Sequence, residues 1–118
     1  MNARKAILIY QFSERIKSEL IIAFKMLEKM ATLSGEEWSG AEKLMTSYLE
    51  SLLGEIRMAQ NVADSSHFKA VEDKIVKAIG HLRLFEQPDL YQCLREATSA
   101  IATSCQAAME KLEAKGLL

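Results

Sequence analysis

The chain has 118 residues, of which 49% are hydrophobic and 26% are charged, and this balance excludes a disordered or fibrous polypeptide. Residues 1–118 are enough for a single domain that buries a sizeable core without disulfides or a structural metal. The formal net charge of −1 gives no electrostatic reason to bind nucleic acid or an anionic membrane, both of which favour a strongly basic surface.

The first predicted element is a helix over residues 6–30, a stretch without Gly or Pro. Apolar side chains recur there every three or four residues and form one continuous stripe, namely Ile9, Phe12, Ile16, Leu20, Ala23, Leu27 and Met30. A strand over residues 6–12 is the alternative, since Ile, Tyr and Phe favour extended structure. No other segment alternates with period two, so such a strand has nothing to pair with, and we favour the helix.

Three apolar residues of this helix, Ile7, Tyr10 and Ile21, project opposite the stripe. The stripe suffices for the core of a bundle, and a four-helix bundle has no fifth element to cover the opposite side. These three residues are either ordinary surface apolar residues, or are covered by a chain end, or form an interface, most simply with a second copy of the chain related by a two-fold axis.

The second predicted helix has two overlapping start signals, Ser34 with Glu37 and Ser39 with Glu42, each of which fits a capping box. The helix extends to about residue 63. Its predicted inward face contains Ala41, Leu44, Met45, Tyr48, Leu52, Ile56, Ala59 and Ala63.

Two residues near or within this helix predict particular contacts. We expect Trp38 to cover one end of the core, because an exposed indole leaves much apolar area in water. The mid-helix Gly54 predicts the close approach of another backbone.

A third helix is predicted over residues 67–85 and a fourth over residues 88–115, with Pro88 at a favourable first helical position. Four amphipathic helices with short connections predict an all-α, antiparallel up-down-up-down four-helix bundle with a long first helix. The predicted inward residues are Phe68, Val71, Ile75, Ile79 and Leu82 in the third helix, and Leu90, Leu94, Ala97, Ile101, Cys105, Ala108 and Leu112 in the fourth.

The two cysteines, Cys93 and Cys105, lie about 18 Å apart along the last predicted helix and cannot bridge each other. Cys105 falls on the apolar stripe, whereas Cys93 falls at its edge, so we expect Cys93 to be the reactive thiol. Free thiols suit a reducing compartment, and no apolar run approaches the roughly 20 residues that span a bilayer. These features predict a cytoplasmic protein.

No residue pattern specifies chemistry, and we assign no catalytic, cofactor-binding or metal-binding residues. The chain lacks the Glu-x-x-His pairs of di-iron bundles, and its histidines, His67 and His81, are about 21 Å apart on one helix. Glu19, Glu55 and Glu72 lie at the margins of their apolar stripes, where carboxylates either converge as an acid–base pair or reach water.

Charged side chains are distributed unevenly between the helices. Residues 1–33 contain six basic and three acidic residues, and residues 34–66 contain two basic and six acidic residues, which favours pairing of the first two helices. Lys74, Lys77 and His81 form an outward row that fits a solvated face better than a phosphate site, because acidic residues lie nearby.

The sequence therefore predicts a non-enzymatic protein–protein interaction module, a homo-oligomer or the subunit of another protein, with no cofactor. The alternative is a metal- or small-ligand-binding bundle or enzyme that uses the margin carboxylates. A nucleic-acid-associated subunit is a weaker alternative.

Overall fold

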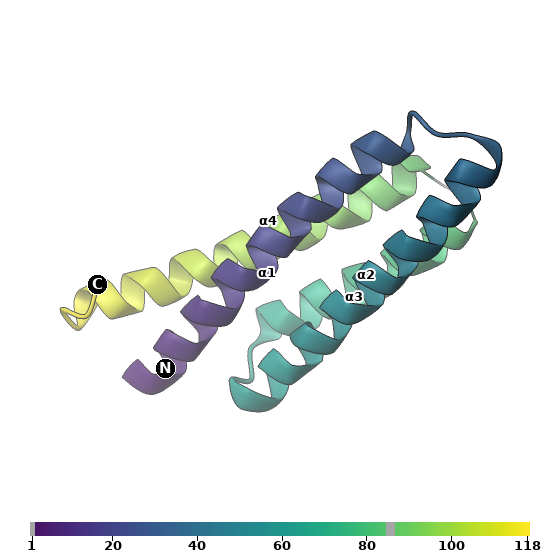
Figure 1. Cartoon of the computed structure of the whole chain (residues 1–118). Helices are drawn as coiled ribbons and strands as arrows, with labels where there is room; N and C mark the ends of the chain where they lie inside the picture. The colour runs from purple at the N-terminus through teal and green to yellow at the C-terminus, as the bar shows by residue number, and fades with distance from the viewer. Residues whose placement is uncertain (1, 85–86) are drawn as a thin grey trace.

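A computed structural model describes residues 2–84 and 87–118 of the chain (Figure 1). Those residues form four α-helices and no strand, the helices being α1 (Ala3–Met30), α2 (Gly35–Val62), α3 (Ser66–Arg83) and α4 (Gln87–Ala114). The all-α four-helix class is thus confirmed. The strand alternative over residues 6–12 is wrong, because the whole segment lies inside α1.

The helices pack in a closed ring in which α1 contacts α2 and α4, and α3 contacts the same two helices. In Figure 1 both chain termini and the corner between α2 and α3 lie at one end of the molecule, while the connection from α1 to α2 lies at the other. Successive helices consequently alternate in direction. The bundle is elongated, with extents of 53, 22 and 18 Å.

The helix boundaries follow from local capping. Asn2 Oδ1 accepts a hydrogen bond from the Lys5 N–H at 2.8 Å, so α1 begins three residues before its predicted start. Ser34 occupies the N-cap position of α2 without a side-chain bond, and Ser39 lies inside the helix, so the second of the two start signals is wrong. The predicted end of the third helix, Phe85, lies outside the described residues.

The lengths of the helices differ. The helices α1, α2 and α4 each have 28 residues, whereas α3 has 18. The first helix is long, as expected, but α2 and α4 match it and α3 is the short one. At 1.5 Å per residue the difference is about 15 Å, which leaves parts of α1 and α4 to extend past α3.

The predicted inward faces of α1 and α4 are largely confirmed, since Ile16, Leu20, Leu94 and Ile101 are fully buried. Trp38 is half-buried and packs on the core from the first turns of α2, as expected.

Two predictions for α2 are wrong. Leu44 is 72% exposed, while the unpredicted Leu49 and Leu53 are buried instead. Gly54 is exposed, and an added Cβ there would meet nothing within 4 Å, so no other backbone approaches it.

Two small polar residues join α1 to α4 inside the bundle. The hydroxyls of Ser13 and Ser104 lie 3.0 Å apart and are both buried. One hydroxyl donates to the other, which gives each of the two buried polar side chains a partner inside the bundle. No helix in the described part of the chain is long and apolar enough to cross a membrane.

Candidate protein–protein interface

Large apolar side chains are exposed along the line where α1 and α2 meet. Ile22 is 48% exposed, Leu44 72%, Met58 57% and Val62 51%. The half-buried Leu8, Phe12 and Met26 lie on the core margin of α1. We call the surface formed by these seven residues the α1–α2 seam.

Helical spacing explains why the α2 residues of the seam share one side. Leu44 and Val62 are 18 residues apart, which is five full turns, so they point in the same direction; Met58 deviates from them by about 40°. The inward stripe of α2 is already filled by other residues. This second apolar row is too far round the helix to reach the core, and it remains at the surface.

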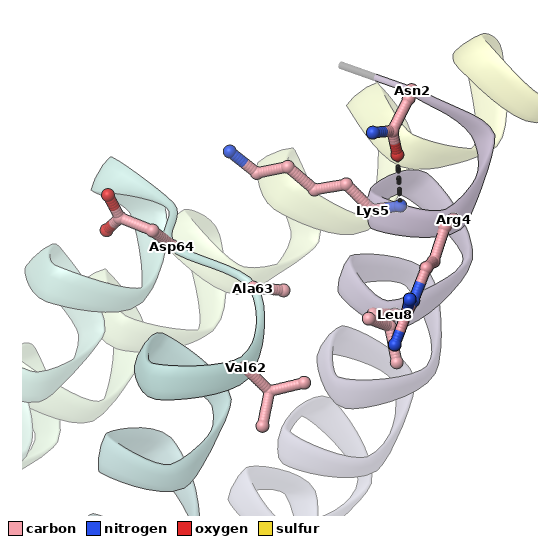
Figure 2. A pocket seen from close by; sticks show the side chains of 7 residues that line it. All are labelled: Asn2, Arg4, Lys5, Leu8, Val62, Ala63 and Asp64. Carbon is pink, nitrogen blue, oxygen red and sulfur yellow. Dashed lines mark hydrogen bonds between the residues drawn. The ribbon is translucent and has the colours of Figure 1, made fainter.

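Two hollows open along the seam. The first lies at the end that contains the N-terminus and has a volume of about 280 Å³ (Figure 2). In Figure 2, Val62 at the end of α2 points toward Leu8 and Arg4 on α1, while Asp64 turns away from them. The second hollow, of about 120 Å³, is lined by Phe12 and Met58 together with Ile16, Arg15 and Glu55.

A cluster of charged and polar groups interrupts the apolar seam near its middle. Arg15 Nη2 donates to Glu55 Oε1 at 2.6 Å, and Arg15 Nε donates to Glu19 Oε1 at 3.3 Å. The Tyr48 hydroxyl donates to the backbone carbonyl of Glu19 at 3.0 Å. The cluster therefore links α1 to α2 across 40 residues of sequence and fixes which levels of the two helices lie together.

Burial raises the pKa of Glu19 to about 7, and the adjacent Glu55 carboxyl raises it further by a hydrogen bond and by its charge, whereas Arg15 opposes the shift. Glu55 Oε2 is buried and accepts no hydrogen bond from a donor within the described residues. Glu19 therefore retains its proton near neutral pH.

Glu72, the third margin carboxylate, does not join this pair. It accepts hydrogen bonds from Arg57 Nε at 2.7 Å, Gln60 Nε2 at 3.0 Å and Lys69 Nζ at 3.2 Å, at the margin of α2 and α3. These three donors lower its pKa to about 2. Two of the three margin carboxylates therefore converge, and the third is an ion-pair residue.

The residues predicted to form an interface on the back of α1 have different surroundings. Ile7 is 40% exposed and Ile21 47%, whereas Tyr10 is half-buried and packs on the core. Ile7 and Ile21 are 14 residues apart, about 21 Å along the helix axis. Without Tyr10 between them they form two separate exposed positions, and their role in an interface stays a prediction.

Both cysteines are buried, with Cys93 8% and Cys105 3% exposed, so the expectation that Cys93 lies at an accessible edge is wrong. The Cys105 thiol donates to Glu14 Oε1 at 2.9 Å, and Lys17 donates to the same oxygen at 3.0 Å. Burial and the Glu14 carboxylate raise the pKa of Cys105 to about 11.

In the predicted basic row, Lys74 forms an ion pair with Glu96 of α4. Among the described residues, no three His, Cys, Asp or Glu side chains group as a metal ion would require.

No protein-family model, no curated protein and no solved structure matches this chain. The chain is an all-α four-helix bundle with exposed apolar residues between α1 and α2, on either side of the Arg15, Glu19 and Glu55 cluster.

Proposed function

We propose that this chain is a non-enzymatic protein–protein interaction module that binds its partner through the α1–α2 seam. The observation that carries the proposal is the exposure of about half or more of Ile22, Leu44, Met58 and Val62 along one strip that also contains two hollows. Scattered apolar residues on a surface need no explanation, but here they form two groups along one helix pair, on either side of the Arg15, Glu19 and Glu55 cluster, and such an arrangement supports a binding site.

The seam has the two parts that an interface needs. Its apolar side chains give affinity, since roughly 25 cal/mol is gained for each Å² of apolar surface removed from water. Its central cluster of Arg15, Glu19 and Glu55 gives selectivity, because a partner that buries these groups without complementary charges loses their hydration. The two free thiols fit a cytoplasmic location, which we propose with this function.

A photo-crosslinking side chain at Met58, tested in cells that make the protein, examines the proposal directly. The matched control places the same group at Val76, which is 47% exposed on α3 among Arg57, Lys69 and Asp73 rather than on the seam. We expect a discrete protein adduct from position 58 and none from position 76. Equal adducts from both positions, or none from position 58, would contradict an interface at the seam.

A second candidate function is the binding of a small cationic ligand at Glu19 and Glu55. It is favoured by the convergence of the two carboxyls beside a hollow lined by Phe12, Ile16 and Met58. A thermal-shift screen with divalent metals and small amines tests it, since a ligand at one hundred times its dissociation constant adds about 2.7 kcal/mol of stability. Glu55→Gln should abolish any shift, and a shift that survives this change would place the ligand elsewhere.

A further inference from the structure

We infer that the partner at the α1–α2 seam is a second copy of this chain, related by a two-fold axis parallel to the helices, so that α1 of each copy lies over α2 of the other. The inference rests on the proposed function and adds to it the identity of the partner and its orientation. The charges of the two helices, their register and the size of the face that they present support it.

The charges on the two helices are opposite in sign. The segment containing α1 has six basic and three acidic residues, and the segment containing α2 has two basic and six acidic residues. An axis parallel to the helices places each basic helix over an acidic one. An axis perpendicular to them would place α1 over α1 and α2 over α2, which brings like charges together.

The register of the charges agrees with this orientation. Arg4, Arg15 and Lys29 lie within about 40° of one another on the seam side of α1. Acidic residues of α2 lie at the corresponding levels for two of these three: Glu55 pairs with Arg15, and Glu37 lies near the level of Lys29.

A two-fold axis that runs along the seam leaves the height of each residue along the helices unchanged. Residues of one copy therefore lie opposite residues at the same height in the other copy. Arg15 and Lys29 of one copy then lie over the acidic side chains near the same levels in the other. The apolar levels match in the same way, so that Val62 of one copy lies over Leu8 of the other, and Met58 over Phe12. A perpendicular axis at the level of Arg15 would instead place Arg15 over Arg15 and Arg4 near Lys29.

The size of the seam suits a two-fold dimer. A helix of 28 residues is about 42 Å long, and two adjacent helices present a strip roughly 20 Å wide. The whole face that α1 and α2 present, of which the seam is a part, is thus about 800 Å², which is large enough for an interface of standard size. The back of α1 offers less, because Ile7 and Ile21 are exposed separately and Tyr10 packs on the core.

Sedimentation of matched variants tests the identity of the partner. Val62→Glu places a carboxylate in the interface twice, and we expect the dissociation constant of the dimer to rise by roughly 100-fold or more. Val76→Glu changes the same residue type at similar exposure, 47% against 51%, but off the seam, and should sediment like the parent. Circular dichroism should show the same helicity in both variants.

The competing surface has its own variant in the same experiment. Ile7→Glu combined with Ile21→Glu should leave the seam dimer intact. Dissociation by this double variant, with Val62→Glu still dimeric, would overturn the inference and assign self-association to the back of α1. A parent chain that stays monomeric at millimolar concentration would also overturn it.

Spin labels on the outer face of α2 test the orientation of the axis. In a chain whose Cys93 and Cys105 are changed to alanine, a single cysteine replaces Lys43, Glu50 or Asn61. All three positions are exposed, and Glu50 lies between the two outer ones. An axis parallel to the helices gives nearly the same distance between copies for all three labels. Distances that are long for the two ends and short for the middle would overturn the parallel axis.

The outcomes separate this inference from the proposed function. If crosslinks from Met58 join the chain to itself and the Val62→Glu variant is monomeric, both stand. If the crosslinks join only a different protein and the parent is monomeric, the seam remains an interface and the second copy is excluded as its partner. If position 58 gives no adduct, the proposed function fails first.

Discussion

Glu19 is a half-buried carboxyl whose proton is retained near neutral pH because Glu55 lies beside it. Arg15 contacts both carboxyls but cannot neutralise two negative charges. Ionising Glu19 in the folded chain therefore costs free energy that ionising it in the unfolded chain does not.

The expected consequence is a loss of stability with rising pH. The folded-state pKa of about 7 exceeds the unfolded value of about 4.3, so the folded chain binds the extra proton between these values. The free energy of unfolding should fall as pH rises through this window. In Glu19→Gln an amide that does not ionise replaces the carboxyl. The free energy of unfolding of this variant should therefore rise relative to that of the parent by about 1 kcal/mol from pH 5 to pH 8.

Urea unfolding at a series of pH values measures this effect. Glu28→Gln removes an exposed carboxyl from the same helix and controls for the change in net charge. A constant difference between the Glu19→Gln variant and the parent across the pH range would show that the pKa of Glu19 is not raised in the folded chain.

The two thiols should react slowly in the folded chain. Both are buried, and burial raises the pKa of each, that of Cys105 to about 11. At pH 8 about one Cys105 in a thousand is then a thiolate, the form that attacks thiol reagents. Labelling followed by mass spectrometry should show slow modification of both residues in buffer and rapid modification in denaturant. Rapid labelling of either thiol in buffer would place it at the surface.

At the scale of the helices, periodicity predicted the elements and most of their inward faces. The stripe of α1 and that of α4 follow from three- and four-residue spacing alone, which is why Leu20 and Leu94 were placed correctly. Leu44 was misplaced because it lies beside the inward residues on the helix, and only the position of α1 decides which edge of the stripe is covered.

Contacts between helices could not be predicted in the same way. Whether Glu19 meets Glu55 depends on the register of α1 against α2. The spacing of residues within either helix does not indicate that register. The seam had a partial signal in the sequence, since Leu44, Met58 and Val62 recur on one side of α2. These three residues are exposed because other residues of α2 fill the core.

The hydroxyl pair between α1 and α4 gives a prediction at this scale. Ser13→Ala leaves the buried Ser104 hydroxyl without its partner, so we expect a loss of about 1–3 kcal/mol, and Ser104→Ala should behave alike. The double variant should lose less than the sum of the two single losses, because no orphaned hydroxyl remains. Chemical denaturation of the four proteins gives the coupling free energy, and strict additivity would mean that the hydroxyls are satisfied independently.

For the whole molecule, the uneven placement of apolar surface matters more than its amount. The core already accounts for the inward stripe of every helix, and the bundle has extents of 53, 22 and 18 Å with its seam running along the longest direction. A second bundle laid along this seam would turn a four-helix bundle into a pair of bundles with α1 and α2 of both copies at the centre. Folding and association would then be linked.

This linkage predicts that thermal stability depends on protein concentration. A folded state that dimerises is favoured by mass action, and each tenfold rise in concentration above the dissociation constant adds about 1.4 kcal/mol per dimer. For a chain of 118 residues this corresponds to a few degrees in Tm for each tenfold step. Scanning calorimetry across a hundredfold range of concentration should show the rise in the parent and in Val76→Glu. In Val62→Glu the new carboxylate opposes closure of the seam, so its Tm should be the same at every concentration. An equal rise in Tm in all three proteins would show that they associate through some other surface.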